Sequence, residues 1–171
     1  VLETETAAAA RGVSVLGEVL GSGHGSDALG LLPIREDGAS LARAIRDALA
    51  DAGLAPGDVG MIVAHGNGTP QSDISEAAAI RRVFGAAPPP MTAFKWALGH
   101  TIAAAGILET ALALEALARG TVPGVANLAR LDPACAGVSV SAAAQKPRSK
   151  VALILCRGFA GTNAALVVRA A

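Results

Sequence analysis

Apolar and polar residues follow two distinct patterns along this chain. Short, continuous apolar runs predict strands, and the clearest is 59–64, whose wholly apolar character is typical of a strand buried on both faces. Longer stretches repeat apolar residues every three or four positions and predict helices, one between Ser40 and Gly53, one over 72–84 and one over 102–119. The full set of expected strands is 12–20, 59–64, 91–93, 121–123, 137–141, 151–156 and 164–168. Strands that alternate with helices favour an α/β fold, with a mixed sheet covered by helices on both faces.

Glycine-rich segments separate some of these elements. We expect a loop over 21–30 after the first strand, and a tight turn over 157–163 between the last two strands. No internal repeat and no low-complexity linker divides the chain, so the pattern predicts one domain.

The composition is apolar for a self-contained domain of this size, with 52% hydrophobic and 16% charged residues among 171. No apolar run approaches the roughly 18 residues that a membrane-spanning helix needs. We therefore expect no membrane segment, and instead an apolar surface that a large partner covers. The 14 basic and 14 acidic residues balance and are scattered, which argues against nucleic acid as a partner.

The cysteines and the start of the chain indicate the cellular setting. Cys135 and Cys156 lie 21 residues apart without CxxC spacing, so we expect no disulfide framework and a reducing cytoplasm. The opening residues lack the basic start and apolar core of a signal peptide, and are typical of the end of an element already under way. The expectation is a chain that begins inside a domain. Three histidines and two cysteines show no ligand spacing for a metal.

Three polar segments interrupt the apolar pattern, each directly after a predicted strand, where ligands gather in α/β folds. The first, 65–69, places His65 beside glycines that allow a ligand to approach the backbone closely. Taken alone, it is equally compatible with a strand-to-helix turn whose histidine is satisfied internally. The third, 157–163, either presents backbone N–H groups to an oxyanion or is an ordinary β-turn.

The second polar segment, 95–101, places Lys95 and His100 five residues apart, just before a predicted helix. A histidine near a helix N-terminus tends to stay neutral and to donate a hydrogen bond. Lys95 can hold an anion, and Glu109 lies in an otherwise apolar helix, where a carboxylate is rarely buried without a partner. The alternatives are a solvated Lys95 and an outward-facing Glu109.

Together these segments resemble a specific family. The chain carries H-G-N-G-T at 65–69, K-W-A-L-G-H at 95–100, a glutamate nine residues after His100, and G-F-A-G-T-N at 158–163. Their order and spacing are similar to those of the β-ketoacyl-acyl-carrier-protein synthases, condensing enzymes of the thiolase-like superfamily. The resemblance extends over essentially the whole chain.

This resemblance implies a fold and a place within it. Residues 1–171 would form the C-terminal ketosynthase domain, the second half of a thiolase-like fold, with a five-stranded mixed sheet and helices packed on both faces. The nucleophilic cysteine of the family belongs to the N-terminal half, which this chain would lack. Neither Cys135 nor Cys156 lies in the family's nucleophile context. The chain alone is therefore expected to be inactive.

The resemblance also implies catalytic roles in a decarboxylating Claisen condensation, which makes the whole protein an acyltransferase. His65 and His100 would donate N–H bonds to the malonyl thioester oxygen as it becomes an enolate. Lys95 would orient and tune the two histidines. Glu109 would hold Lys95 or a bound ion behind it.

The remaining implied roles concern the substrates. Phe159, with Gly158 beside it, would form the gate and the oxyanion site for the acyl thioester. Asn67 and Thr69 would line the channel for the phosphopantetheine arm of the acyl carrier protein, and no other cofactor is expected. Expected partners are that carrier, the N-terminal half of the same synthase, and a second subunit in a homodimer or ketosynthase heterodimer.

Four positions depart from the family pattern, namely Asn67, Trp96, Arg157 and Ala160. They leave both histidines and Lys95 in place, and bear on acyl selectivity and gate motion. The alternative function is a non-catalytic homologue that shapes a partner's pocket, as a chain-length factor does. A thiolase is disfavoured, because that family carries a catalytic cysteine near its final glycine turn.

Overall fold

The computed structural model describes residues 1–171. The five α-helices are α1 (Glu5–Ala10), α2 (Ala39–Asp51), α3 (Pro70–Phe84), α4 (Lys95–Leu98) and α5 (Ala105–Ala118). The six strands are β1 (Gly17–Ser26), β2 (Met61–Val63), β3 (Pro90–Thr92), β4 (Ser139–Val140), β5 (Val151–Gly158) and β6 (Thr162–Ala170). Helices α2, α3 and α5 confirm the three helices predicted from periodicity. The α/β class is therefore confirmed.

All six strands belong to one mixed sheet, in the order β1-β6-β5-β2-β3-β4. β6 runs antiparallel to both β1 and β5, while β2 is parallel to β5 and to β3. The sheet has six strands, whereas the resemblance implied five and the apolar pattern seven. The strand expected over 137–141 is the two-residue β4, which pairs parallel with β3. The strand expected over 121–123 is not formed, and only an isolated bridge joins Val122 to Gln145.

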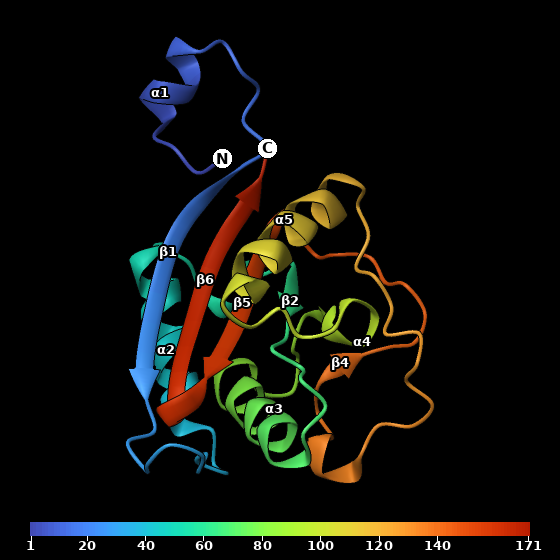
Figure 1. Ribbon diagram of the computed structural model, residues 1–171. Coiled ribbons are helices and arrows are strands. Elements are labelled where there is room, and N and C mark those ends of the chain that lie inside the picture. The colour runs from blue at the N-terminus through green and yellow to red at the C-terminus, as the bar shows by residue number, and fades with distance from the viewer.

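Helices cover both faces of the sheet, as expected (Figure 1). Successive residues of β5 explain why two cores form, since side chains alternate between the faces of a strand. Leu153 and Leu155 are buried with α2 and α3, whereas Ala152 and Ile154 are buried with α5. Because both faces are covered, β5 needs a continuous apolar run rather than an alternating one.

β1 corrects the sequence prediction. The strand begins at Gly17 rather than residue 12 and continues to Ser26, through the segment that we expected to be a loop. A Cβ atom on Gly21 or Gly23 would collide with backbone atoms of α2, so these glycines allow the helix to lie directly on the strand. Glycine at alternate positions is therefore a strand signal here, not a loop signal.

Several apolar side chains remain uncovered. Leu16, Leu32, Ile102 and Ile107 are each more than 60% exposed. A groove of about 380 Å³, lined largely by apolar groups, opens between α5 and the sheet, beside Cys156 and other residues. Figure 1 shows α1 standing apart from the sheet, near the end of β6. None of the helices has both the length and the apolar character required to cross a membrane.

Candidate active site

The three polar segments gather at one edge of the sheet. His65 follows β2, Lys95 opens α4 after β3, and Phe159 follows β5, which is parallel to β2. Because parallel strands end at the same edge, these residues converge although they are spread over the sequence. The imidazole rings of His65 and His100 lie edge to face, with centroids 5.3 Å apart and planes at 73°. The predicted proximity of the two histidines is confirmed, while their catalytic roles stay predictions.

His65 is held rigidly at the end of β2, with 2% of its surface exposed. Its Nδ1 accepts a hydrogen bond from the backbone N–H of Arg157 at 3.2 Å. A ring nitrogen that accepts cannot carry the proton, so the neutral ring carries it on Nε2. Burial, followed by the nearby charge of Lys95, lowers the pKa of His65 to about 3. His65 is therefore a neutral imidazole that donates from Nε2.

The backbone at His65 is also fixed. Glu76 of α3 accepts the backbone N–H of His65 at 2.7 Å and that of Gly66 at 3.0 Å, one on each carboxylate oxygen. Burial raises the pKa of Glu76 to about 6, against the lowering effect of these two hydrogen bonds.

His100 presents the same tautomer from the opposite side. Its Nδ1 accepts the backbone N–H of Ile102 at 3.0 Å, which leaves the proton of the neutral ring on Nε2. Ile102 has a φ of 52°, a conformation that costs a β-branched residue energy and is found mainly at functional sites. His100 is exposed, whereas His65 is buried. Each of the two neighbouring rings thus has Nδ1 occupied and Nε2 left as its donor.

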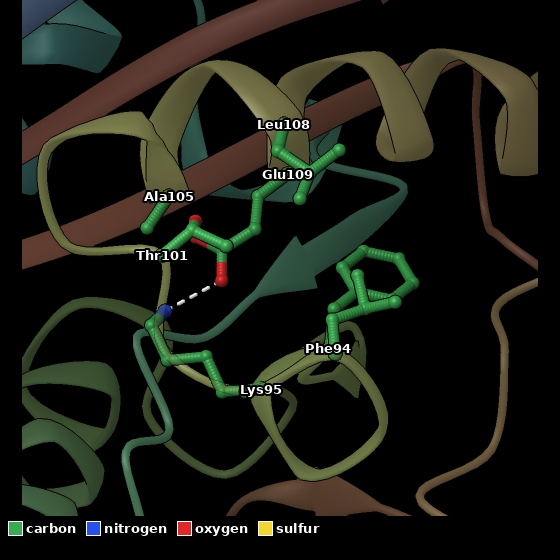
Figure 2. A pocket seen from close by; sticks show the side chains of 8 residues that line it. Phe94, Lys95, Thr101, Ala105, Leu108 and Glu109 are labelled. Carbon is green, nitrogen blue, oxygen red and sulfur yellow. Dashed lines mark hydrogen bonds and ion pairs between the residues drawn. The ribbon is translucent and has the colours of Figure 1, made fainter.

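Lys95 and Glu109 form a buried ion pair beside the histidines. Figure 2 shows Lys95 reaching from α4 to the carboxylate of Glu109 on α5, with Nζ and Oε1 2.5 Å apart. Their side chains are 5% and 3% exposed, so the alternatives of a solvated lysine and an outward-facing glutamate are wrong. Burial raises the pKa of Glu109, while Lys95 acts in the opposite direction. The second oxygen of Glu109, Oε2, is buried without a hydrogen-bond partner.

The turn between β5 and β6 places Phe159 at the surface, with 72% of the residue exposed. Ala160 has a φ of 58°, so this family departure does put a methyl group in the left-handed region that favours glycine. The backbone N–H of Ala160 donates to the carbonyl of Leu31 at 2.8 Å, and the hydroxyl of Thr162 donates to that of Phe159. Gly158 is extended and ends β5.

Asn67 and Thr69 lie in an exposed loop between β2 and α3. The side-chain oxygen of Asn67 accepts both the backbone N–H of Thr69 at 3.0 Å and its hydroxyl at 2.8 Å. This turn uses the hydroxyl proton of Thr69 internally. What Thr69 offers a ligand is therefore a hydrogen-bond acceptor.

Sequence reasoning missed the structural roles of Glu76 and Arg157. Ser72, Ser75, Glu76, Ala79 and Ile80 share the buried face of α3, and a charged residue on such a face is the signal that could have shown Glu76. Arg157 follows Leu153 and Leu155 in the alternation of β5, which directs its side chain toward the same α3 face.

Neither cysteine has the environment of a nucleophile. Cys135 is buried and Cys156 half-buried, and burial raises the pKa of both thiols, whereas reactive cysteines have a lowered pKa. No group of three or more histidine, cysteine, aspartate or glutamate side chains is arranged to hold a metal ion.

Comparisons with known proteins show the family to which the chain belongs. The family model for the C-terminal domain of β-ketoacyl synthases matches residues 16–129. The chain is 35% identical over 168 residues to 3-oxoacyl-[acyl-carrier-protein] synthase 2 of Mycobacterium bovis, covering 96% of this chain and 40% of the relative. The chain thus spans about 40% of the length of this curated relative.

Two solved structures are similar in fold. The ishigamide ketosynthase/chain length factor superposes with a TM-score of 0.89 at 36% identity, covering 99% of this chain and 41% of that one. The AntDE ketosynthase, solved with its type II polyketide acyl-carrier protein AntF, gives a TM-score of 0.91 at 32% identity, covering 99% and 42%. These similarities confirm the thiolase-like fold. The chain belongs to the β-ketoacyl synthase family, as its C-terminal domain.

Proposed function

We propose that this domain stabilises the enolate in a decarboxylating Claisen condensation, as part of a β-ketoacyl-acyl-carrier-protein synthase in fatty-acid or polyketide synthesis. One observation carries the proposal. Backbone N–H groups occupy Nδ1 of both His65 and His100, which leaves an Nε2–H donor on each of two rings whose centroids are 5.3 Å apart.

In the proposed reaction, a malonyl thioester binds with its carbonyl oxygen at the two Nε2–H groups. The bond to the carboxylate breaks, carbon dioxide leaves, and the electron pair of that bond moves into the enolate, whose negative charge lies largely on the thioester oxygen. The enolate carbon then attacks an acyl thioester on a cysteine and expels the cysteine thiolate. Donors that are already oriented stabilise the oxyanion as it forms, without reorganising at that moment.

Neutral histidines suit this role. A charged imidazolium would transfer its proton to the enolate, whereas a neutral ring donates a hydrogen bond and keeps its proton. Burial and the charge of Lys95 favour the neutral form of His65, with a pKa of about 3. Glu109 holds that lysine at 2.5 Å, so the ammonium group keeps a fixed position in the site.

The substrate roles rest on the exposed residues of the site. Phe159 and Gly158 would gate the acyl chain and supply a backbone N–H to its thioester. Thr69, positioned by Asn67, would accept a hydrogen bond from an amide N–H of the phosphopantetheine arm. A polyketide acyl-carrier protein bound to a ketosynthase of this fold supports such a carrier as partner.

The nucleophile, and the surface that covers the apolar groove, would come from a region that corresponds to the part of the relatives outside the match. The match covers 40% of the Mycobacterium bovis synthase, so the larger part of that protein lies outside it. We propose that such an N-terminal half packs on the groove between α5 and the sheet, and that the assembled protein is a homodimer or a ketosynthase heterodimer.

The second candidate function is that of a non-catalytic partner that shapes another subunit's pocket. One similar structure is the ishigamide ketosynthase/chain length factor, and this similarity supports a role of the chain-length-factor kind as the alternative. The presence of His65, His100 and Lys95 together argues against it, because a purely structural partner does not need oriented donors.

The test is condensation by the assembled synthase. Incubated with acyl- and malonyl-carrier protein, it should yield the 3-oxoacyl product, detected by mass spectrometry, whereas the chain alone should not. Phe159→Ala should disturb the order of the acylation and condensation steps without abolishing acyl uptake. An assembled protein that carries a cysteine at the nucleophile position, yet neither takes up an acyl group nor condenses it, would support the non-catalytic candidate.

A further inference from the structure

We infer that Arg157 is a positioning residue for His65, because its guanidinium fixes the end of β5 on α3 and its own backbone N–H holds the imidazole. The inference rests on the proposed function, since it assigns Arg157 a part in enolate stabilisation. It gives a purpose to a buried side chain that departs from the family pattern.

The guanidinium of Arg157 is buried and extensively bonded. Its side chain is 5% exposed, Nε donates to the side-chain oxygen of Asn163 at 3.0 Å, and Nη1 donates to the backbone carbonyl of Ser72 at 3.0 Å. Nη2 donates to the hydroxyl of Ser75 at 3.2 Å and lies 3.6 Å from a carboxylate oxygen of Asp27. A planar fork that is bonded on all three nitrogens has one permitted position, which lysine could not reproduce.

The backbone of the same residue makes the contact with His65. β5 continues four residues past Ile154, the last residue that it pairs with β2. The N–H of Arg157 therefore has no strand partner on that side, and Nδ1 of His65 accepts it at 3.2 Å. This bond sets the tautomer and the direction of the ring.

Helix α3 connects the two ends of this arrangement. It supplies Ser72 and Ser75 to the guanidinium. The next residue, Glu76, accepts the backbone N–H groups of His65 and Gly66. The ring of His65 is thus tied to α3 through Arg157, and its backbone is tied to α3 directly. If β5 shifted relative to α3, the distance between the Arg157 N–H and Nδ1 would change.

The charges around the guanidinium favour its burial. Burial lowers the pKa of Arg157, and the nearby carboxyl groups of Glu76, Asp27 and Asp73 offset this effect only in part. A buried charge that keeps several acidic and hydrogen-bonding partners is stable, whereas removing it leaves those partners uncompensated. Arg157→Met should therefore release β5 locally as well as remove the bonds.

The first experiment uses the chain itself and needs no catalysis. With ¹⁵N-labelled histidine, long-range ¹H–¹⁵N spectra should show His65 wholly in the Nε2–H tautomer in the unmodified chain. Arg157→Met should give a mixture of tautomers, and Arg157→Lys, which keeps the charge but not the fork, an intermediate mixture. The matched control is Arg148→Met, because Arg148 also donates two hydrogen bonds to backbone carbonyls, those of Ala87 and Pro88, on another part of the fold.

The second experiment measures carbon dioxide release from malonyl-carrier protein by the assembled synthase. Arg157→Met should lower kcat by about tenfold to a hundredfold with little change in KM, because misplaced catalytic groups cost rates of this order. Arg157→Lys should recover part of the rate, and Arg148→Met should leave it unchanged.

The outcomes separate this inference from the proposed function. An unaltered His65 tautomer in folded Arg157→Met or Arg157→Lys overturns the positioning role, whatever the enzyme does. A changed tautomer, with no decarboxylation by the unmodified synthase, supports the positioning of His65 and refutes the proposed reaction. Equal tautomer changes in Arg148→Met would show a general loss of stability and would also overturn the inference.

Discussion

Replacing His65 by Gln should change how the stability of the folded chain depends on pH. The unfolded imidazole has its ordinary pKa of 6.5, whereas burial lowers the pKa in the fold to about 3. Between these values the unfolded state binds more protons than the folded state, so stability falls as pH falls below 6.5. Because one pKa unit corresponds to about 1.4 kcal/mol, this single group should cost about 2 kcal/mol between pH 7 and pH 5.

Glu76 acts in the opposite direction over the same range. Burial raises its pKa from 4.5 to about 6, so the folded state binds the extra proton and stability rises as pH falls from 6 toward 4.5. Between pH 7 and pH 5 the gain is about 1 kcal/mol. The two effects partly cancel, so His65 and Glu76 together should lower the stability by only about 1 kcal/mol.

His65→Gln removes one of these two opposing contributions. The change in stability of the variant between pH 7 and pH 5 should therefore be about 2 kcal/mol more favourable than that of the unmodified chain. Equilibrium urea unfolding at pH 7, 6 and 5 measures both proteins, and every other titrating group cancels in the comparison. Parallel pH profiles for the two proteins would refute the assignment of His65 as a buried neutral imidazole.

Other predictions concern packing and backbone. Lys95→Met should lower the free energy of unfolding by about 3–5 kcal/mol, because it leaves the Glu109 carboxylate buried without its partner; adding Glu109→Leu should restore most of the loss in urea titrations. Ala160→Gly should raise the melting temperature, since the left-handed conformation at φ 58° costs an alanine about 1 kcal/mol, and an unchanged value would contradict this strain. Gly23→Ala should destabilise the fold strongly through collision with the backbone of α2, while Gly25→Ala, whose Cβ would meet only one atom at 3.4 Å, should have a small effect.

The predictable elements are those whose own sequence shows which residues are buried. β5 is apolar at every position because helices cover both sheet faces, and α2 repeats its apolar residues at helical spacing. β1 was placed wrongly because its inward positions carry glycine, and only the closeness of α2, distant in sequence, shows that glycine there means packing. The third element of the site, α4, spans only four residues and is too short for periodicity to reveal.

The candidate site was predictable from the order and spacing of its motifs, but its electrostatics were not. The resemblance implied that Glu109 would hold Lys95 or a bound ion, but the burial of the pair depends on the approach of α4 to α5. The bonds from Arg157 to Ser72 and Ser75 join residues 85 and 82 positions apart, so no local pattern reports them. Such contacts follow from the tertiary fold. The backbone N–H groups that determine the tautomers of the histidines are likewise placed by the fold.

The most direct test of the account is carbon dioxide release from malonyl-carrier protein by the assembled synthase, with His65→Ala and His100→Ala compared with the unmodified protein. Each variant should lose about a hundredfold or more in rate, since each removes one oriented donor from the forming oxyanion. Arg119→Ala, which removes an exposed side chain at the far end of α5, should release carbon dioxide at the unmodified rate. Equal release by all four proteins would contradict the claim that the two histidines stabilise an enolate.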